Sequence, residues 1–100
     1  MKIETLWKQL FGNKKEAMDY AGRIMVFLDI GQNKGTAPTI DHLKPLALGG
    51  TNDPSNLIIC SLLTNQEKSD SFPTWNANGK TFQVKRVKGT HNQYVIWTNK

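Results

Sequence analysis

The stretch that decides the fold covers residues 39–70 and reads TIDHLKPLALGGTNDPSNLIICSLLTNQEKSD. Residues 39–43 are β-prone at their start, and a segment dense in glycine, asparagine and proline follows them. Residues 57–60 form a short apolar run that is typical of a strand. Ser61 is a residue type that caps helices, so a helix is predicted over 62–68. The pattern therefore predicts two short strands followed directly by a helix.

Polar side chains that could bind a metal ion or transfer a proton lie at defined positions in this unit. Asp41 and His42 end the first predicted strand, and Asn65 lies on the predicted helix. If the strands pair and the helix packs across them, the Asp41 carboxylate and the Asn65 amide can meet on one side. His42 then points to the other face, because neighbouring strand residues alternate. Carboxylate and amide oxygens suit Mg²⁺ better than zinc, and two protein ligands leave positions open for water and phosphate.

His42 and Asn56 complete this chemical interpretation. A histidine is partly neutral near pH 7, so His42 can take a proton from an attacking water. A metal ion held beside it would polarise the phosphate and stabilise the leaving oxygen. Asn56, in the turn-rich loop, can hydrogen-bond to backbone and hold that loop against the strand that carries His42.

A frame of residues at fixed spacing carries a resemblance to a known family. It consists of Asp41-His42, Gly49-Gly50, Asn56-Leu57 and Asn65-x-x-Lys68. This frame resembles the HNH endonuclease motif, also called the ββα-metal fold. The third motif position is Asn65 rather than histidine, which the family tolerates, as in the HNH domain of CRISPR effector nucleases.

The resemblance implies hydrolysis of DNA phosphodiester bonds with one divalent metal ion, Mg²⁺ or Mn²⁺. It makes His42 the general base and Asn56 a structural brace of the catalytic site. Asp41 and Asn65 become the metal ligands. Residues 16–25 also resemble the lead-in of a small bacterial and phage-type group of these enzymes.

Many proteins of this family bind a structural zinc through two Cys-x-x-Cys pairs that flank the motif. Judged by position, the corresponding residues here are Phe27, Ile30, Ser61 and Thr64, and none is cysteine. The one cysteine of the chain, Cys60, lies in an apolar strand and is interpreted as a small core residue. We therefore expect no structural zinc.

The flanking segments complete an α+β interpretation. An apolar stripe predicts a helix over 3–11, and apolar residues at helical spacing predict a second helix from 13 to about 28. In that second helix, Arg23 is expected to pair with Asp19 one turn before it. The chain of 100 residues is interpreted as a single domain. Its parts are a helical lead-in over 1–30, the ββα-metal unit over 38–70 and a C-terminal basic β-hairpin or ribbon over 74–98.

Charge is unevenly spread along the chain. Thirteen Lys and Arg against eight Asp and Glu give a net charge of +5, and no acidic residue follows Asp70. Basic residues interleaved with aromatic residues are typical of nucleic-acid binding, although such aromatics are more often core. His91 lies in a polar turn and is interpreted as exposed and inert. The candidate DNA contacts are Lys68, Lys80, Lys85, Arg86 and Lys88.

These observations favour a DNA endonuclease, with a non-catalytic DNA-binding accessory protein of the same fold as the alternative. An acidic protein partner is the third option. A single site makes one nick, so a homodimer is left open as the route to a double-strand break. No apolar run is long enough for a membrane span, and the first four residues do not resemble a signal peptide, so a cytoplasmic protein is expected.

Overall fold

A computed structural model describes residues 1–90 and 93–99 of the chain, so His91 lies outside the described residues. The described part contains small antiparallel sheets and two α-helices, an α+β architecture. The sheets pair β1 with β2, β3 with β4, and, in the three-stranded sheet, the central β6 with both β5 and β7. The elements are α1 (Ile3–Phe11), β1 (Glu16–Met18), β2 (Ile24–Val26), β3 (Pro38–His42), β4 (Leu57–Ser61), α2 (Leu62–Lys68), β5 (Thr74–Ala77), β6 (Lys80–Arg86) and β7 (Tyr94–Asn99).

The strands and helix expected over 39–68 are present as β3, β4 and α2. β3 pairs with β4 so that Thr39 lies opposite Cys60 and Asp41 lies opposite Ile58. The α2 helix begins at the residue after β4 ends, and the Ser61 hydroxyl caps it by accepting a hydrogen bond from the Thr64 amide. Because no loop separates β4 from α2, the helix is held at a fixed angle across the hairpin.

The predicted helix over 13–28 is wrong. These residues form the β1–β2 hairpin, in which Ala17 lies opposite Met25. Gly22 adopts a φ of +86°, which no helix accommodates, and the Asp19 carboxylate accepts hydrogen bonds from the amides of Ala21 and Arg23. The side-chain pairing of Arg23 with Asp19 is wrong for the same reason, since Arg23 pairs with Glu67 of α2 instead.

The C-terminal ribbon is a three-stranded sheet rather than a single hairpin. Asn78 and Gly79 both have positive φ values between β5 and β6, as a tight two-residue turn of this kind requires. Side chains alternate along β5 and β6, so Trp75 and Phe82 are buried while their neighbours face solvent. This alternation leaves one face of the sheet for the core and one for solvent.

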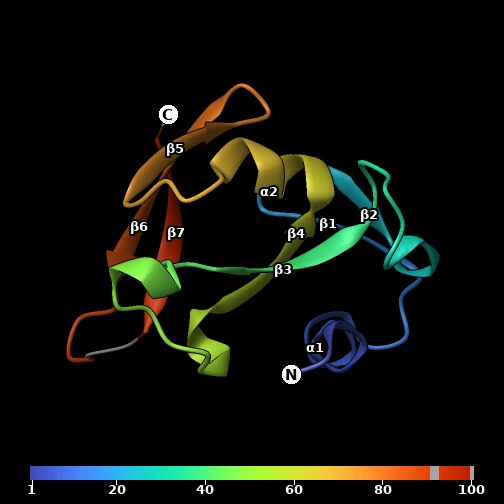
Figure 1. Cartoon of the computed structure of the whole chain (residues 1–100), viewed down its shortest axis with the longest axis horizontal. Helices are drawn as coiled ribbons and strands as arrows, with labels where there is room; N and C mark the ends of the chain where they lie inside the picture. The colour runs from blue at the N-terminus through green and yellow to red at the C-terminus, as the bar shows by residue number, and fades with distance from the viewer. Residues whose placement is uncertain (91–92, 100) are drawn as a thin grey trace.

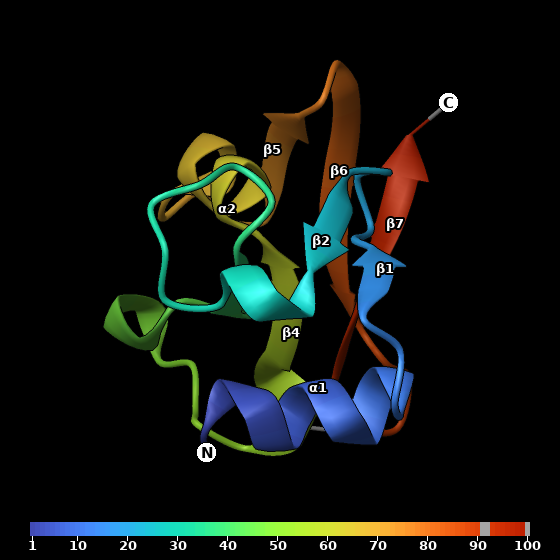
Figure 2. The same ribbon diagram turned by 90° about the vertical axis from the view of Figure 1, so that its right-hand side faces the viewer.

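Two apolar clusters hold the hairpin β3–β4 between its neighbours (Figure 1). One cluster joins α1 to this hairpin through Trp7, Met25 and Ile59. The other joins it to the three-stranded sheet, with Trp75 and Phe82 at its centre. Figure 2 shows α1 along the lower edge of the molecule, beneath the N-terminal hairpin. The ββα unit is therefore supported from both sides.

A polar cluster ties the β1–β2 turn to the start of α2. The Asp19 carboxylate accepts a hydrogen bond from the Ser61 amide at 3.0 Å, and the Arg23 guanidinium donates to the Thr64 hydroxyl at 3.2 Å. The residues that face Ser61 and Thr64 therefore belong to the 19–23 turn, whereas Phe27 packs against Trp7. Phe27 and Ile30, the positions expected for the first zinc-ligand pair, are therefore not the residues that these hydrogen bonds bring to Ser61 and Thr64.

Burial alone would raise the pKa of Asp19, but hydrogen bonds outweigh it. The Thr64 side chain and the backbones of Arg23 and Ser61 stabilise the carboxylate, so the pKa lies below its ordinary value of 3.8. A carboxyl group whose pKa is lowered by folding stabilises the folded state above its unfolded pKa. That contribution is lost as the pH falls through the folded pKa.

Replacing Asp19 by Asn should lower the free energy of unfolding at pH 7 by about 1–3 kcal/mol, because buried amide donors lose a charged acceptor. Denaturant unfolding at pH 7 and at pH 3 measures this. The gap between wild type and variant should narrow at pH 3. Glu16→Gln, at an exposed position of the same hairpin, is the control and should cost little. Equal stability of Asp19→Asn and wild type at pH 7 would show that the cluster does not hold the hairpin.

Candidate active site

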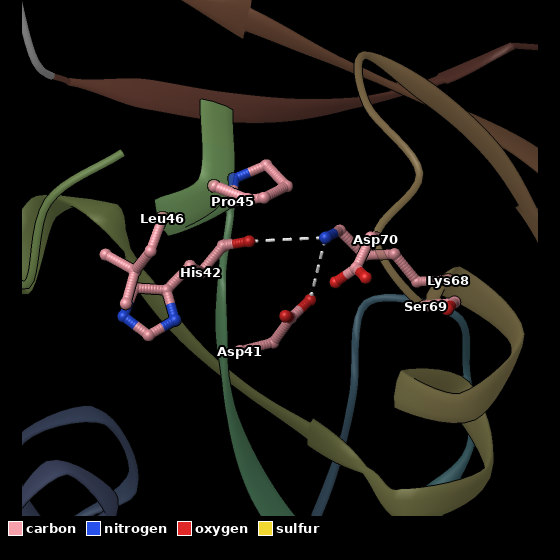
Figure 3. Close-up of a pocket in the computed structure, with 8 residues that line it drawn as sticks. Asp41, His42, Pro45, Leu46, Lys68, Ser69 and Asp70 are labelled. Atoms are coloured by element: carbon pink, nitrogen blue, oxygen red, sulfur yellow. Dashed lines mark hydrogen bonds and ion pairs between the residues drawn. The ribbon is translucent and has the colours of Figure 1, made fainter. Parts of the chain in front are cut away.

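A cavity of about 220 Å³ opens where β3 and α2 end. Asp41 and His42 are the last two residues of β3, and Lys68 comes from the last turn of α2 (Figure 3). The rest of the wall comes from the loop after each element. The lining residues are Asp41, His42, Pro45, Leu46, Ala47, Lys68, Ser69 and Asp70.

Asp41 faces α2 and forms an ion pair with Lys68. Its Oδ2 atom lies 3.1 Å from the Lys68 ammonium, and the Asp41 side chain is 13% exposed. Oδ2 is buried and has no hydrogen-bond partner among the described residues. The ammonium therefore neutralises the carboxylate charge without forming a hydrogen bond to Oδ2. This oxygen keeps the capacity to bind a cation.

Lys68 is a buried residue rather than a surface charge. Only 1% of its side chain is exposed, and its ammonium also donates a hydrogen bond to the His42 carbonyl oxygen at 3.2 Å. The ammonium lies 5.2 Å from the centre of the Trp75 ring, a cation–π distance. Its expected DNA contact stays a prediction, and any such contact would be made from inside the cavity.

Asn65 lies one turn before Lys68 on α2 and contacts the same face of β3. Its amide nitrogen donates to the Thr39 hydroxyl at 2.9 Å, and that hydroxyl donates in turn to the Cys60 carbonyl oxygen. Because the Thr39 proton is used on Cys60, the Asn65 amide must present nitrogen to Thr39 and keep its oxygen free of this contact. Thr39 and Asp41 share one face of β3, so Asp41 and Asn65 lie on one side of the unit, as the sequence predicts.

His42 points away from Asp41, as strand alternation predicts (Figure 3). Its Nε2 atom lies 2.7 Å from the Asn52 Oδ1 atom. An amide oxygen only accepts hydrogen bonds, so Nε2 carries the proton and Nδ1 is the basic nitrogen of the neutral ring. The sequence shows Asn52 only as part of the glycine-rich motif, and its contact with His42 depends on how the loop folds back.

Asn56 braces the loop between β3 and β4. It is fully buried, and its side chain makes three hydrogen bonds to backbone groups of Lys44 and Thr51. The loop also needs glycine at position 50, where a Cβ atom would lie 1.8 Å from the Lys44 carbonyl oxygen. All three hydrogen bonds of the Asn56 side chain go to backbone groups. Asn56 therefore fixes the shape of the loop that carries Asn52 next to His42.

The oxygen donors fit a hard divalent cation. Among the described residues no three His, Cys, Asp or Glu side chains converge in a group that could hold a metal ion. The available donors are instead the buried Oδ2 of Asp41 and the amide oxygen of Asn65, which the contact with Thr39 does not use. A set of two oxygens suits Mg²⁺ or Mn²⁺, which keep several waters when bound to protein.

The candidate DNA-binding residues of the C-terminal sheet are all exposed. Lys85 and Arg86 lie on opposite faces of β6, as alternation predicts. The Lys85 ammonium lies 4.8 Å from the centre of the Trp97 ring, and Trp97 is 55% exposed. The aromatics therefore divide, with Trp75 and Phe82 in the core and Trp97 at the surface. Lys80 and Lys88 are the other exposed candidates.

Cys60 is a buried member of the scaffold. It has no exposed surface, and burial raises the pKa of its thiol to about 12. The thiol therefore stays protonated and does not take part as a nucleophile or metal ligand.

Replacing Asn56 by Ala should lower the free energy of unfolding by about 2 kcal/mol or more, because several backbone groups of the loop lose their partners in a buried place. Denaturant unfolding measures this, with Asn76→Ala as the exposed control. If Asn56→Ala lowers the free energy of unfolding no more than Asn76→Ala does, the loop is held by other contacts.

Comparison with known proteins gives one match. A family model described as HNH endonuclease matches residues 20–74, which is more than half of the chain and includes the whole ββα unit. No curated protein and no solved structure matches the chain. In the part that the structure describes, no helix has the length and apolar character needed to cross a bilayer.

Proposed function

Since the chain belongs to the HNH endonuclease family, we propose that it hydrolyses phosphodiester bonds of DNA with the help of one divalent metal ion. The observation that supports this best is the pairing of two features at one cavity. A buried carboxylate oxygen of Asp41 has no hydrogen-bond partner within the described part of the chain, and the histidine directly after it is oriented by Asn52. A protein that only binds DNA has no need of either feature.

Asp41 and Asn65 are the proposed ligands of the metal ion, with Mg²⁺ or Mn²⁺ favoured by their oxygen donors. When bound, the ion would polarise the scissile phosphate and stabilise the leaving oxygen. The chain itself fixes the position of these ligands. Thr39 orients the Asn65 amide, and the direct join of β4 to α2 sets that amide over β3.

His42 is the proposed general base. The Asn52 Oδ1 atom accepts a hydrogen bond from Nε2–H, so Nδ1 is the atom that takes a proton from the attacking water. Asn56 acts indirectly by holding the loop that carries Asn52. This arrangement resembles the general logic in which one group holds the ring while the opposite nitrogen carries out proton transfer.

The proposed DNA contacts are the exposed Lys80, Lys85, Arg86 and Lys88, with Lys68 inside the cavity. Phosphate contacts of this kind set affinity and not sequence preference. One active site makes one nick, so we propose nicking by a single chain, and the homodimer stays a prediction for double-strand cleavage. The alternative function, a DNA-binding accessory protein without catalysis, needs the basic residues but not His42.

Replacing His42 by Ala should lower the rate of plasmid nicking by about 10²–10⁴-fold, the usual contribution of a general base. The assay follows supercoiled plasmid with Mg²⁺ or Mn²⁺, and EDTA should stop the wild-type reaction. DNA affinity and thermal stability should stay close to wild type, because His42 is partly exposed at the cavity.

Asn52→Ala provides the companion variant, since it keeps the imidazole and removes its partner. It should nick faster than His42→Ala and more slowly than wild type. Nicking by His42→Ala at the wild-type rate would favour the accessory protein or a different base.

Replacing both Lys85 and Arg86 by Ala should weaken DNA binding about equally across sequences. Each lost phosphate contact on duplex DNA lowers the slope of log affinity against log salt by about 0.9. Fluorescence anisotropy over a salt series measures the slope. The single variants should differ, because the two side chains lie on opposite faces, and we favour Arg86 for its planar guanidinium. An unchanged slope in the double variant would place the DNA elsewhere.

A further inference from the structure

Lys68 already supplies a positive charge where the proposed metal site needs one. Its ammonium lies 3.1 Å from Asp41 Oδ2 and donates to the His42 carbonyl oxygen (Figure 3). The same ammonium lies 5.2 Å from the centre of the Trp75 ring. These contacts come from β3 and β5, so the ammonium is enclosed from both sides. The side chain is 1% exposed.

The carboxylate that holds this lysine is the carboxylate proposed to hold the metal ion. Oδ2 of Asp41 has the lysine as its charged partner and accepts no hydrogen bond from residues 1–90 or 93–99. A divalent ion bound to the same carboxylate would bring two more positive charges beside a buried ammonium. Like charges at such short range in a place shielded from water repel strongly. The two cations therefore compete for one anion.

The helix links this competition to the other proposed ligand. Asn65 and Lys68 lie one turn apart on α2 and contact β3 at Thr39 and at Asp41. Asp41 and Asn65, the residues that would hold the metal ion, thus both lie close to the ammonium or one helical turn from it. The lysine stem is long and flexible, and the cavity beside it, lined also by Ser69 and Asp70, gives the ammonium a place to go.

We propose that Lys68 is an internal cation that neutralises Asp41 in the metal-free chain and is displaced from it when a divalent ion binds. The inference rests on the proposed function, since it takes Asp41 as a metal ligand. Displacement moves the ammonium into the cavity, where it can contact a DNA phosphate. The lysine then serves as a positioning residue that couples metal binding to phosphate binding.

Metal affinity of a variant tests this directly. Lys68→Met keeps an unbranched stem against Trp75 and removes the charge. Calorimetric titration with Mn²⁺ should give a dissociation constant about tenfold lower than that of wild type, within the usual range for coupled sites. Lys8→Met, at an exposed position of α1, is the matched control and should bind Mn²⁺ like wild type. Unchanged or weaker Mn²⁺ binding by the folded Lys68→Met variant overturns the proposal.

A measurement on the wild-type chain covers the case in which Lys68→Met does not fold. Protein labelled with ¹⁵N-lysine is titrated with Mg²⁺ while the ammonium resonances are followed by NMR. The Lys68 resonance, assigned with a Lys68→Arg variant, should shift or vanish with the midpoint of Mg²⁺ binding, whereas that of the exposed Lys80 should not. A Lys68 resonance that stays unchanged at saturating Mg²⁺ overturns the proposal.

The same data separate this inference from the proposed function. Metal binding and nicking by wild type together with an undisturbed Lys68 overturn the inference alone. Absence of Mn²⁺ and Mg²⁺ binding to wild type and variant overturns both the inference and the metal-dependent mechanism.

Discussion

The direct passage from β4 into α2 is the constraint on which the candidate site depends. Ser61 ends the strand and caps the helix, and its amide is held by Asp19. Because no loop separates the two elements, the direction in which α2 crosses β3 is fixed. Successive turns of α2 therefore lie over Thr39 and over Asp41. The amide and ammonium groups of the site are therefore positioned by backbone geometry before any ligand arrives.

The sequence predicts the ββα unit well because several local signals agree there. A short apolar run, a turn-rich loop and a capping serine all point to the same elements. The segment over 13–28 lacks that agreement. Ala17 and Met25 fit the spacing of a helix and also lie opposite each other in a hairpin, while Gly22 and Asp19 carry the turn signal. Periodicity over so short a segment does not separate these two structures.

In the candidate site, too, the features set by strand and helix spacing are predictable from the sequence, and the contacts set by the tertiary fold are not. Opposite directions for Asp41 and His42 follow from strand alternation, and the position of Asn65 follows from helix register. The contact of Asn52 with His42 depends on a loop path that no spacing rule gives. The burial of Lys68 depends on Trp75 of a later strand, so a helix charge that looks solvated in sequence is enclosed in the folded chain. Membership of the HNH endonuclease family rests on residues 20–74, and the outer basic sheet lies mostly beyond that match.

The cluster of Asp19, Arg23, Ser61 and Thr64 has a consequence for how the scaffold and the chemistry relate. Hydrogen bonds join the N-terminal hairpin to the ββα unit, and a carboxylate with a lowered pKa is at their centre. These hydrogen bonds depend on the pH, because they require the ionised Asp19 carboxylate. The proposed reaction depends instead on the concentration of divalent ions. Under the proposed mechanism, a chelator would stop turnover and leave these hydrogen bonds intact, while acid would weaken them at any metal concentration. The proposed mechanism then expects a metal-free chain to stay folded and to regain activity when ions are added.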